Sequence, residues 1–202
     1  MVEVNHAPAV AVLPEPPRVG AYRVAVDLDD PHGLTAFIRE IDDWPEPGVS
    51  FKDLTPLFAD AGAFSTAIDR LAAPFAERGV AKVIGMEARG FVVASPVAHR
   101  LGAGFVPVRK PDKLPWDTEI EPYELEYGED HLEIHRDAIV AGERVLILDD
   151  VLATGGTAAA TLRLVETLGG DVVGLGFVVE LGFLGGVSRL GGHEHHTLVT
   201  YR

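Results

Sequence analysis

The sequence contains no cysteine, few basic residues and no long apolar run. Without cysteine the chain forms no disulfide, thiolate metal site or cysteine nucleophile. Its 17 Lys and Arg stand against 31 Asp and Glu, for a net charge of -14. That balance argues against a general binder of nucleic acid or of membrane surfaces, because such proteins carry basic patches. No apolar run approaches the ~20 residues of a membrane span, and no secretory signal is visible. We therefore expect a cytoplasmic protein with neither of these partners.

The residue pattern indicates one α/β domain over residues 29–202, preceded by a tail. Residues 1–28 carry four prolines, Pro8, Pro14, Pro16 and Pro17, and no helical period. We expect a poorly ordered tail there, with at most a short strand over 22–26. In the rest of the chain, apolar strands alternate with helices. This alternation predicts a largely parallel twisted sheet flanked by helices.

Periodicity and capping residues predict the individual elements. Asp30 and Pro31 are suited to begin a helix, and apolar residues then recur at helical spacing up to Ile41. Residues 111–128 are predicted to be irregular, and loops of that length often close over active sites. The other expected elements are an amphipathic helix closing at Gly79, helices over 90–101 and 156–168, and strands over 82–86, 105–108, 132–135, 144–148 and 172–179.

The strongest motif follows the apolar run 145–148. Two carboxylates, Asp149 and Asp150, come first, and a loop rich in glycine and threonine then opens a helix: Ala153, Thr154, Gly155, Gly156 and Thr157. Free N–H groups at a helix start bind anions, and glycines let the backbone approach a phosphate closely. Adjacent carboxylates suit the two hydroxyls of a ribose or waters on Mg2+. A phosphorylated ribose is the predicted ligand, and a plain strand–turn–helix junction is the alternative.

This run resembles the signature of the type I phosphoribosyltransferases, which bind 5-phosphoribosyl-1-pyrophosphate (PRPP). Other nucleotide motifs are absent, since the chain has no G-x-x-x-x-G-K-[ST] and no complete dinucleotide fingerprint. Further segments resemble the adenine phosphoribosyltransferases within that family: PGVSFKDLT at 47–55, EARGF at 87–91, FVPVRKPDKLP at 105–115 and LEYGEDHLEI at 125–134. The similarity spans about residues 34–182, with the motifs in the family's order. It implies the type I phosphoribosyltransferase fold, in which a small hood region accompanies the sheet.

The resemblance also implies an activity. A purine salvage enzyme would transfer the 5-phosphoribosyl group of PRPP to adenine, giving AMP and pyrophosphate, with Mg2+ as cofactor and a homodimer as the assembly. Two alternatives stay open. One is transfer to another purine base, such as hypoxanthine, guanine or xanthine. The other is a regulator that binds PRPP without catalysis, which we expect to carry a DNA-binding module and a basic patch.

Site residues follow from the same resemblance. It implies that 153–157 hold the 5-phosphate and that Asp149 and Asp150 face the ribose hydroxyls. The pyrophosphate needs cations, and four basic residues lie near the ends of predicted strands or in the loops that follow: Arg89, Arg109, Lys110 and Lys113. Any one of them alone would read as solvated surface charge. Arg89 is also close enough in sequence to pair with Glu87.

The lid and the base site depend most on the resemblance. Glu126 is the candidate to exchange a proton with the purine as N9 attacks, and Tyr127 would donate to the leaving group or order the lid. An aromatic face and apolar neighbours are expected to hold adenine, with backbone groups near 49–52 reading its amine: Val49, Phe51, Lys52, Val151 and Leu152.

One further cluster lies outside these motifs. His193, His195 and His196, together with Glu194, have residue types that bind metals. Their position among glycines near the C-terminus favours a polar turn that leads into a last strand.

Overall fold

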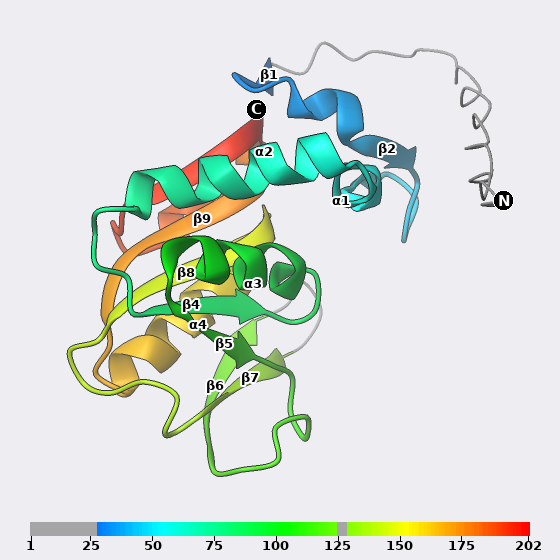
Figure 1. Ribbon diagram of the computed structural model, residues 1–202. Coiled ribbons are helices and arrows are strands. Elements are labelled where there is room, and N and C mark those ends of the chain that lie inside the picture. The colour runs from blue at the N-terminus through cyan, green and yellow to red at the C-terminus, as the bar shows by residue number, and fades with distance from the viewer. Residues whose placement is uncertain (1–27, 125–128) are drawn as a thin grey trace, which may run out of the picture.

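The computed structural model describes residues 28–124 and 129–202. Its centre is a six-stranded sheet in the order β1-β10-β9-β8-β4-β5 (Figure 1). All neighbouring strands are parallel except β1, which pairs antiparallel with β10. The strands are β1 (Leu28–Asp29), β4 (Lys82–Met86), β5 (Gly104–Val108), β8 (Arg144–Leu152), β9 (Asp171–Leu181) and β10 (His195–Tyr201). The predicted α/β fold with a largely parallel sheet is confirmed.

Two small antiparallel hairpins accompany the sheet. The first consists of β2 (Arg39–Asp42) and β3 (Ser50–Asp53), and the second of β6 (Thr118–Glu124) and β7 (Glu129–His135). The hairpin β2–β3 contributes to a cavity at the carboxyl end of the sheet and is the expected hood.

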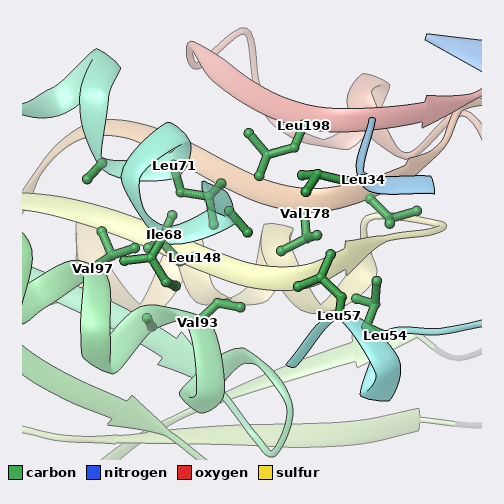
Figure 2. Packing of buried hydrophobic residues seen from close by; sticks show 14 of the residues in the cluster. Leu34, Leu54, Leu57, Ile68, Leu71, Val93, Val97, Leu148, Val178 and Leu198 are labelled. Atoms are coloured by element: carbon green, nitrogen blue, oxygen red, sulfur yellow. The ribbon is translucent and has the colours of Figure 1, made fainter. Parts of the chain in front are cut away.

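Helices cover both faces of the sheet. They are α1 (Thr55–Ala59), α2 (Ala61–Ala72), α3 (Gly90–Leu101) and α4 (Gly156–Thr167), with short 3-10 turns η1 (Leu34–Phe37), η2 (Ala73–Phe75), η3 (Gly182–Leu184) and η4 (Gly186–Arg189). On one face, α2 and α3 pack against the sheet around Leu148, Val178 and Leu198 (Figure 2). On the other, α4 and the hairpin β6–β7 enclose a second cluster that includes Ile147 and Phe177.

Local sequence explains where the predicted helices begin and end. Asp60 caps α2, because its carboxylate accepts a hydrogen bond from the N–H of Ala63 at 2.8 Å. Such a cap contributes about 1 kcal/mol. Gly102 ends α3 in the left-handed conformation, with φ of 67°, where glycine carries no side-chain penalty. None of the helices in the described part of the chain has the length and apolar character that a membrane crossing needs.

The α-helix predicted to begin after Asp30 is wrong, because only a 3-10 turn forms, over residues 34–37. The carboxylate of Asp30 does accept from the N–H groups of Leu34 and Thr35, at 2.9 and 2.8 Å, but the turn that follows is only η1. Residues 39–42 instead form β2, which pairs with β3. Pairing with a strand further along the chain supplies the backbone hydrogen bonds that a helix would have made.

The segment predicted to be irregular contains a strand. Residues 118–124 form β6, which pairs with β7 along its whole length. Pro122 lies within β6, and a two-stranded hairpin tolerates it because proline is excluded mainly from central strands. Residues 125–128, the predicted strand over 22–26 and all of the predicted tail except Leu28 lie outside the described residues.

Candidate active site

A cavity of about 330 Å3 lies at the carboxyl end of the sheet. Ligand sites of parallel α/β proteins are found at this end, because the loops that follow the strands converge there. Three segments line the cavity, namely 49–52, 87–89 and 149–151, together with Ala153, Thr157 and Leu181. Residues predicted from separate motifs therefore come together around one cavity.

Two aspartates form the floor of this cavity at the end of β8. This strand extends to Leu152, four residues beyond its predicted end, so that both carboxylates lie within the strand. Asp150 is only 4% exposed, and its Oδ2 lies 2.9 Å from Nε of Arg89. Oδ1 of Asp149 accepts a hydrogen bond from the N–H of Asp150 at 2.9 Å. The two acids are thus close to each other and to one cation.

Electrostatics make this pair costly to ionise. Burial, and then the charge of Asp150, raise the pKa of Asp149 well above its usual range. Burial also raises the pKa of Asp150, although the Arg89 cation opposes this. Although Nε of Arg89 lies 2.9 Å from Oδ2 of Asp150, this ion pair lacks the alignment of a hydrogen bond, and no other described residue donates to that oxygen. A ligand that brought hydroxyl donors or a cation would offset this charge.

Gly90, the first residue of α3, packs directly against the carboxylate of Asp149. A Cβ on Gly90 would lie 2.6 Å from Oδ1 of Asp149, nearer than two such atoms can approach. The glycine therefore lets the N-terminal end of α3 approach the carboxylate, where the helix dipole favours negative charge.

The glycine-rich loop adopts the conformation that the sequence predicts. Gly155 has a φ of 79° and precedes the first turn of α4, so the free N–H groups of that turn face the loop. A Cβ on Gly155 would lie 2.5 Å from the carbonyl oxygen of Gly186, the first residue of η4. The loop is therefore held against a second glycine segment. Sequence analysis missed this partner, although the pair Gly185-Gly186 was visible as a signal.

A basic cluster surrounds Glu87 at the rim of the cavity. Its carboxylate accepts hydrogen bonds from Nε of Arg109 at 3.1 Å, from the N–H of Lys110 at 3.1 Å and from Nζ of Lys113. Burial opposes ionisation, but these hydrogen bonds outweigh it and lower the pKa of Glu87. The expected pairing of Arg89 with Glu87 is wrong, because Arg89 pairs with Asp150 on the neighbouring strand.

Comparison with known proteins agrees with this geometry. Residues 57–183 match the model of the phosphoribosyl transferase domain family. An adenine phosphoribosyltransferase of Myxococcus xanthus is 54% identical over 168 residues, which is 83% of this chain and 91% of the relative. The chain belongs to the adenine phosphoribosyltransferase family.

Solved adenine phosphoribosyltransferases share the fold as well. The enzyme of Rhodothermus marinus superposes with a TM-score of 0.80 at 52% identity, covering 83% of this chain and 96% of its own. The Saccharomyces cerevisiae enzyme, solved with adenine and an imino-altritol bisphosphate, gives a TM-score of 0.78 at 41% identity, with 82% and 96% covered.

Phe51, which the family resemblance assigns to adenine, lines the cavity and contacts two further side chains. The guanidinium carbon of Arg89 lies 5.2 Å from the centre of the Phe51 ring, and Trp44 packs edge-on against that ring at 4.4 Å. Val49 and Val151 line the same cavity. Phe51 thus brings an aromatic face, Val49 and Val151 bring apolar groups, and Arg89 brings a cation to the cavity.

Two of the assigned residues are placed differently. Leu152 is 1% exposed and belongs to the core cluster beneath α4, so its side chain does not line the cavity. Lys52 lines the cavity, but its ammonium is turned to Glu40 at 3.1 Å and lies 4.5 Å from the ring centre of Tyr201. Its charge is therefore already paired.

The hairpin β6–β7 links the basic cluster to the glycine-rich loop. Nζ of Lys110 lies 2.8 Å from Oδ2 of Asp130, and the Tyr123 hydroxyl donates to the same oxygen at 3.1 Å. Burial, and then Asp130, raise the pKa of Tyr123 to about 12, whereas a hydrogen bond with Thr157 opposes the rise. Sequence analysis missed Tyr123 and Asp130, since only strand pairing places them opposite each other.

The two predicted lid residues lie outside the described part of the chain. Glu126 and Tyr127 belong to residues 125–128, which join β6 to β7. The strand pairs nearest to them are Tyr123 with Asp130 and Glu124 with Glu129. Of these four residues, Tyr123 and Asp130 contact each other, and Asp130 also contacts Lys110.

The histidine cluster lies away from this cavity. Nε2 of His193 lies 3.5 Å from Oε1 of Glu166, while Glu194 forms a two-fold ion pair with Arg78, each bond 2.6 Å long. The described residues contain no group of three or more His, Cys, Asp or Glu side chains that could hold a metal ion. The segment leads into β10, as the interpretation of a polar turn into a last strand predicts.

Proposed function

We propose that this protein transfers the 5-phosphoribosyl group of PRPP to adenine and releases AMP and pyrophosphate, a reaction of purine salvage. The observation that carries the proposal is the arrangement of Asp149, Asp150, Arg89 and the glycine-rich loop around one cavity beneath the hood. The yeast family member that was solved with adenine and a sugar-like bisphosphate supports the same pair of ligand types.

The donor is proposed to bind along the carboxyl ends of β8 and β4. Residues 153–157 would hold the 5-phosphate, through backbone N–H groups at the start of α4 and the hydroxyls of Thr154 and Thr157. Asp149 and Asp150 would accept hydrogen bonds from the ribose hydroxyls. These bonds favour the charged carboxylates and thereby offset the cost of burying them.

Magnesium fits this site as a companion of the donor. The raised pKa values of Asp149 and Asp150 indicate buried carboxylates that a cation would stabilise. Two carboxylates are too few for a full magnesium shell, so substrate oxygens and waters would supply the other ligands. When bound, Mg2+ neutralises charge on the leaving pyrophosphate. Four cations would share that charge: Arg89, Arg109, Lys110 and Lys113.

Adenine is proposed to lie against Phe51, with Val49 and Val151 beside it. Because the Lys52 ammonium is paired with Glu40, selectivity for the exocyclic amine would rest on backbone acceptors near 49–52. The bond from the anomeric carbon to pyrophosphate breaks as the bond to N9 forms. Glu126 is proposed to take the proton that N9 loses, and Tyr127 to order the lid or donate to the leaving group.

A homodimer is proposed as the working assembly. Strand β5 is an edge of the central sheet. Phe105 on that strand is 37% exposed, and Val92 of α3 is 40% exposed. An exposed sheet edge and exposed apolar side chains favour burial against a second copy. Light scattering on the purified protein tests this assembly.

The cytoplasm is the proposed compartment, because no secretory signal and no apolar run of membrane length is visible in the sequence.

Pyrophosphate release, measured with PRPP, Mg2+ and each purine base in turn, tests the activity. We expect release with adenine and much less with hypoxanthine, guanine or xanthine. Activity with hypoxanthine and none with adenine would overturn the substrate assignment. Tight binding of PRPP without turnover on any base would favour a non-catalytic regulator.

A further inference from the structure

Glu87 is the anion around which the basic side chains at the rim of the cavity are arranged. Its side chain is only 10% exposed, and its own N–H donates to the carbonyl of Val108 at 3.0 Å. The residue is therefore fixed between β4 and β5. From there its carboxylate accepts hydrogen bonds from the side chains of Arg109 and Lys113 and from the backbone N–H of Lys110, in the segment that follows β5.

The contacts with Glu87 leave some N–H donors of Arg109 and Lys113 available to a ligand. Arg109 uses Nε for Glu87 and Nη1 for the carbonyl of Lys113, at 3.3 Å, which fixes the plane of the guanidinium. Of the described residues, none accepts a hydrogen bond from its Nη2. Lys113 directs Nζ toward Glu87, and an ammonium carries three N–H donors. The remaining donors of both side chains can bind oxygens of a second anion.

The negative charge of Glu87 also reduces charge repulsion within residues 109–113. Three cations within five residues repel one another, although the exposure of Lys110 and Lys113 lets solvent screen part of that repulsion. The lowered pKa of Glu87 keeps its carboxylate ionised at neutral pH. Asp130 pairs with Lys110, so two negative charges lie among three positive charges and the rim stays attractive to anions. Glu87 itself lies between Arg109 and Lys113 and removes much of the repulsion between them.

We propose that Glu87 is a positioning residue for the pyrophosphate end of the donor, an inference that rests on the proposed function. It aligns Arg109 and Lys113 by binding one donor of each and leaves their other donors to the pyrophosphate oxygens. Preorganised donors bind an anion more tightly, because the ligand does not have to order them. Glu87 thereby acts on the ligand through the cations and not by touching it.

Calorimetric titration of the full chain with magnesium pyrophosphate and, separately, with AMP tests this role. Glu87→Gln keeps the shape of the side chain and removes its charge. We expect the Kd for pyrophosphate to rise about 10-fold, the effect of losing one charge-assisted hydrogen bond. The Kd for AMP should change by less than about 2-fold, since AMP carries no pyrophosphate group. Glu87→Asp should restore part of the pyrophosphate affinity.

Asp69→Asn is the matched control. Asp69 lies on α2 and forms an exposed ion pair with Arg100 at 2.9 Å, so the change removes the same charge and one ion pair away from the cavity. It should leave both affinities unchanged. Unchanged or tighter pyrophosphate binding by Glu87→Gln would overturn the proposal, and so would equal weakening of pyrophosphate and AMP. A wild-type protein that binds neither ligand would instead contradict the proposed function.

Discussion

Nε of Arg89 lies 2.9 Å from Oδ2 of Asp150, while the guanidinium carbon lies 5.2 Å from the ring centre of Phe51. One side chain from the turn after β4 therefore contacts both the carboxylate of β8 and the aromatic ring of the hood. Its charge opposes the rise in the pKa of Asp150, but burial still keeps the pKa of both aspartates above the usual range. Ionising these two buried carboxylates is therefore costly, and a bound cation or the hydroxyl donors of a substrate would lower that cost.

Asp149→Asn is expected to abolish activity while it stabilises the fold. The amide keeps an oxygen that can accept the hydrogen bond from the N–H of Asp150, now 2.9 Å long, and it removes one of two buried like charges. We expect a gain of about 1 kcal/mol at neutral pH, or roughly 2–4 °C in Tm for a domain of this size. Thermal unfolding and the adenine assay together measure both effects.

The pH dependence of this gain has a definite sign. Because the pKa of Asp149 is raised in the folded state, ionising it costs stability as the pH rises from the unfolded value toward the folded one. The advantage of Asn should therefore be largest at neutral pH and vanish near pH 3, where the wild-type residue is protonated in both states. Asp171→Asn, which removes an exposed charge paired with Arg144, should show no such gain. A loss of Tm at pH 7 for Asp149→Asn would contradict the burial penalty.

Gly155→Ala is expected to displace the glycine-rich loop. Its φ of 79° already costs about 1–2 kcal/mol for alanine, and the new Cβ would meet the carbonyl of Gly186 at 2.5 Å. Gly142→Ala is a matched control, since Gly142 has a φ of 83° and no atom within 4 Å of a Cβ. Both variants should lose stability, but only Gly155→Ala should weaken AMP binding, by about 10-fold or more. Equal AMP affinity in the two variants would show that the contact with Gly186 is unimportant.

Much of the fold was predictable because its signals are local. The strand Lys82–Met86 has the predicted limits, because an apolar run marks it. The helix α4 starts at Gly156 as predicted, after a glycine turn, and ends one residue before the predicted Leu168. The helix predicted within residues 30–42 is wrong because the structure of this region depends on a contact that is distant in sequence. Apolar residues such as Ile38 and Ile41 fit a helical period, but a partner strand at 50–53 decides their structure, and that partner cannot be read from a short window.

The site was predictable as a set of motifs but not as a set of contacts. The pairing of Arg89 with Asp150 joins residues far apart in sequence and depends on β4 and β8 being neighbours. Glu87 was considered only as a neighbour of Arg89, whereas the parallel pairing of β4 with β5 brings it to Arg109. In both cases the pairing partner could not be inferred from nearness in sequence, because the order of strands in the sheet determines which charged side chains are neighbours.

Phe51→Leu is expected to raise the KM for adenine about 10-fold or more, with a smaller effect on the KM for PRPP. Stacking of a base on an aromatic ring contributes roughly 1–3 kcal/mol, and leucine keeps apolar volume without that face. Steady-state kinetics with each substrate varied separately measure the two constants. Phe64→Leu is the control, since Phe64 packs against Phe58 on the helical layer at 5.9 Å and should change stability alone. A selective rise in the KM for PRPP would place adenine elsewhere.

Glu126→Gln tests the proposed proton transfer. Glutamine keeps the length and the hydrogen-bonding oxygen of the side chain but cannot take the N9 proton, so kcat should fall by about 100-fold or more. Binding of AMP and of pyrophosphate should stay within a few-fold of the wild type, because neither product needs that proton transfer to bind. Glu121→Gln is a suitable comparison, since Glu121 lies on β6 of the same hairpin and pairs with Arg163 outside the cavity. A defect that appears only as weaker binding, with kcat unchanged, would remove the acid–base role from Glu126 and leave the lid with a role in binding alone.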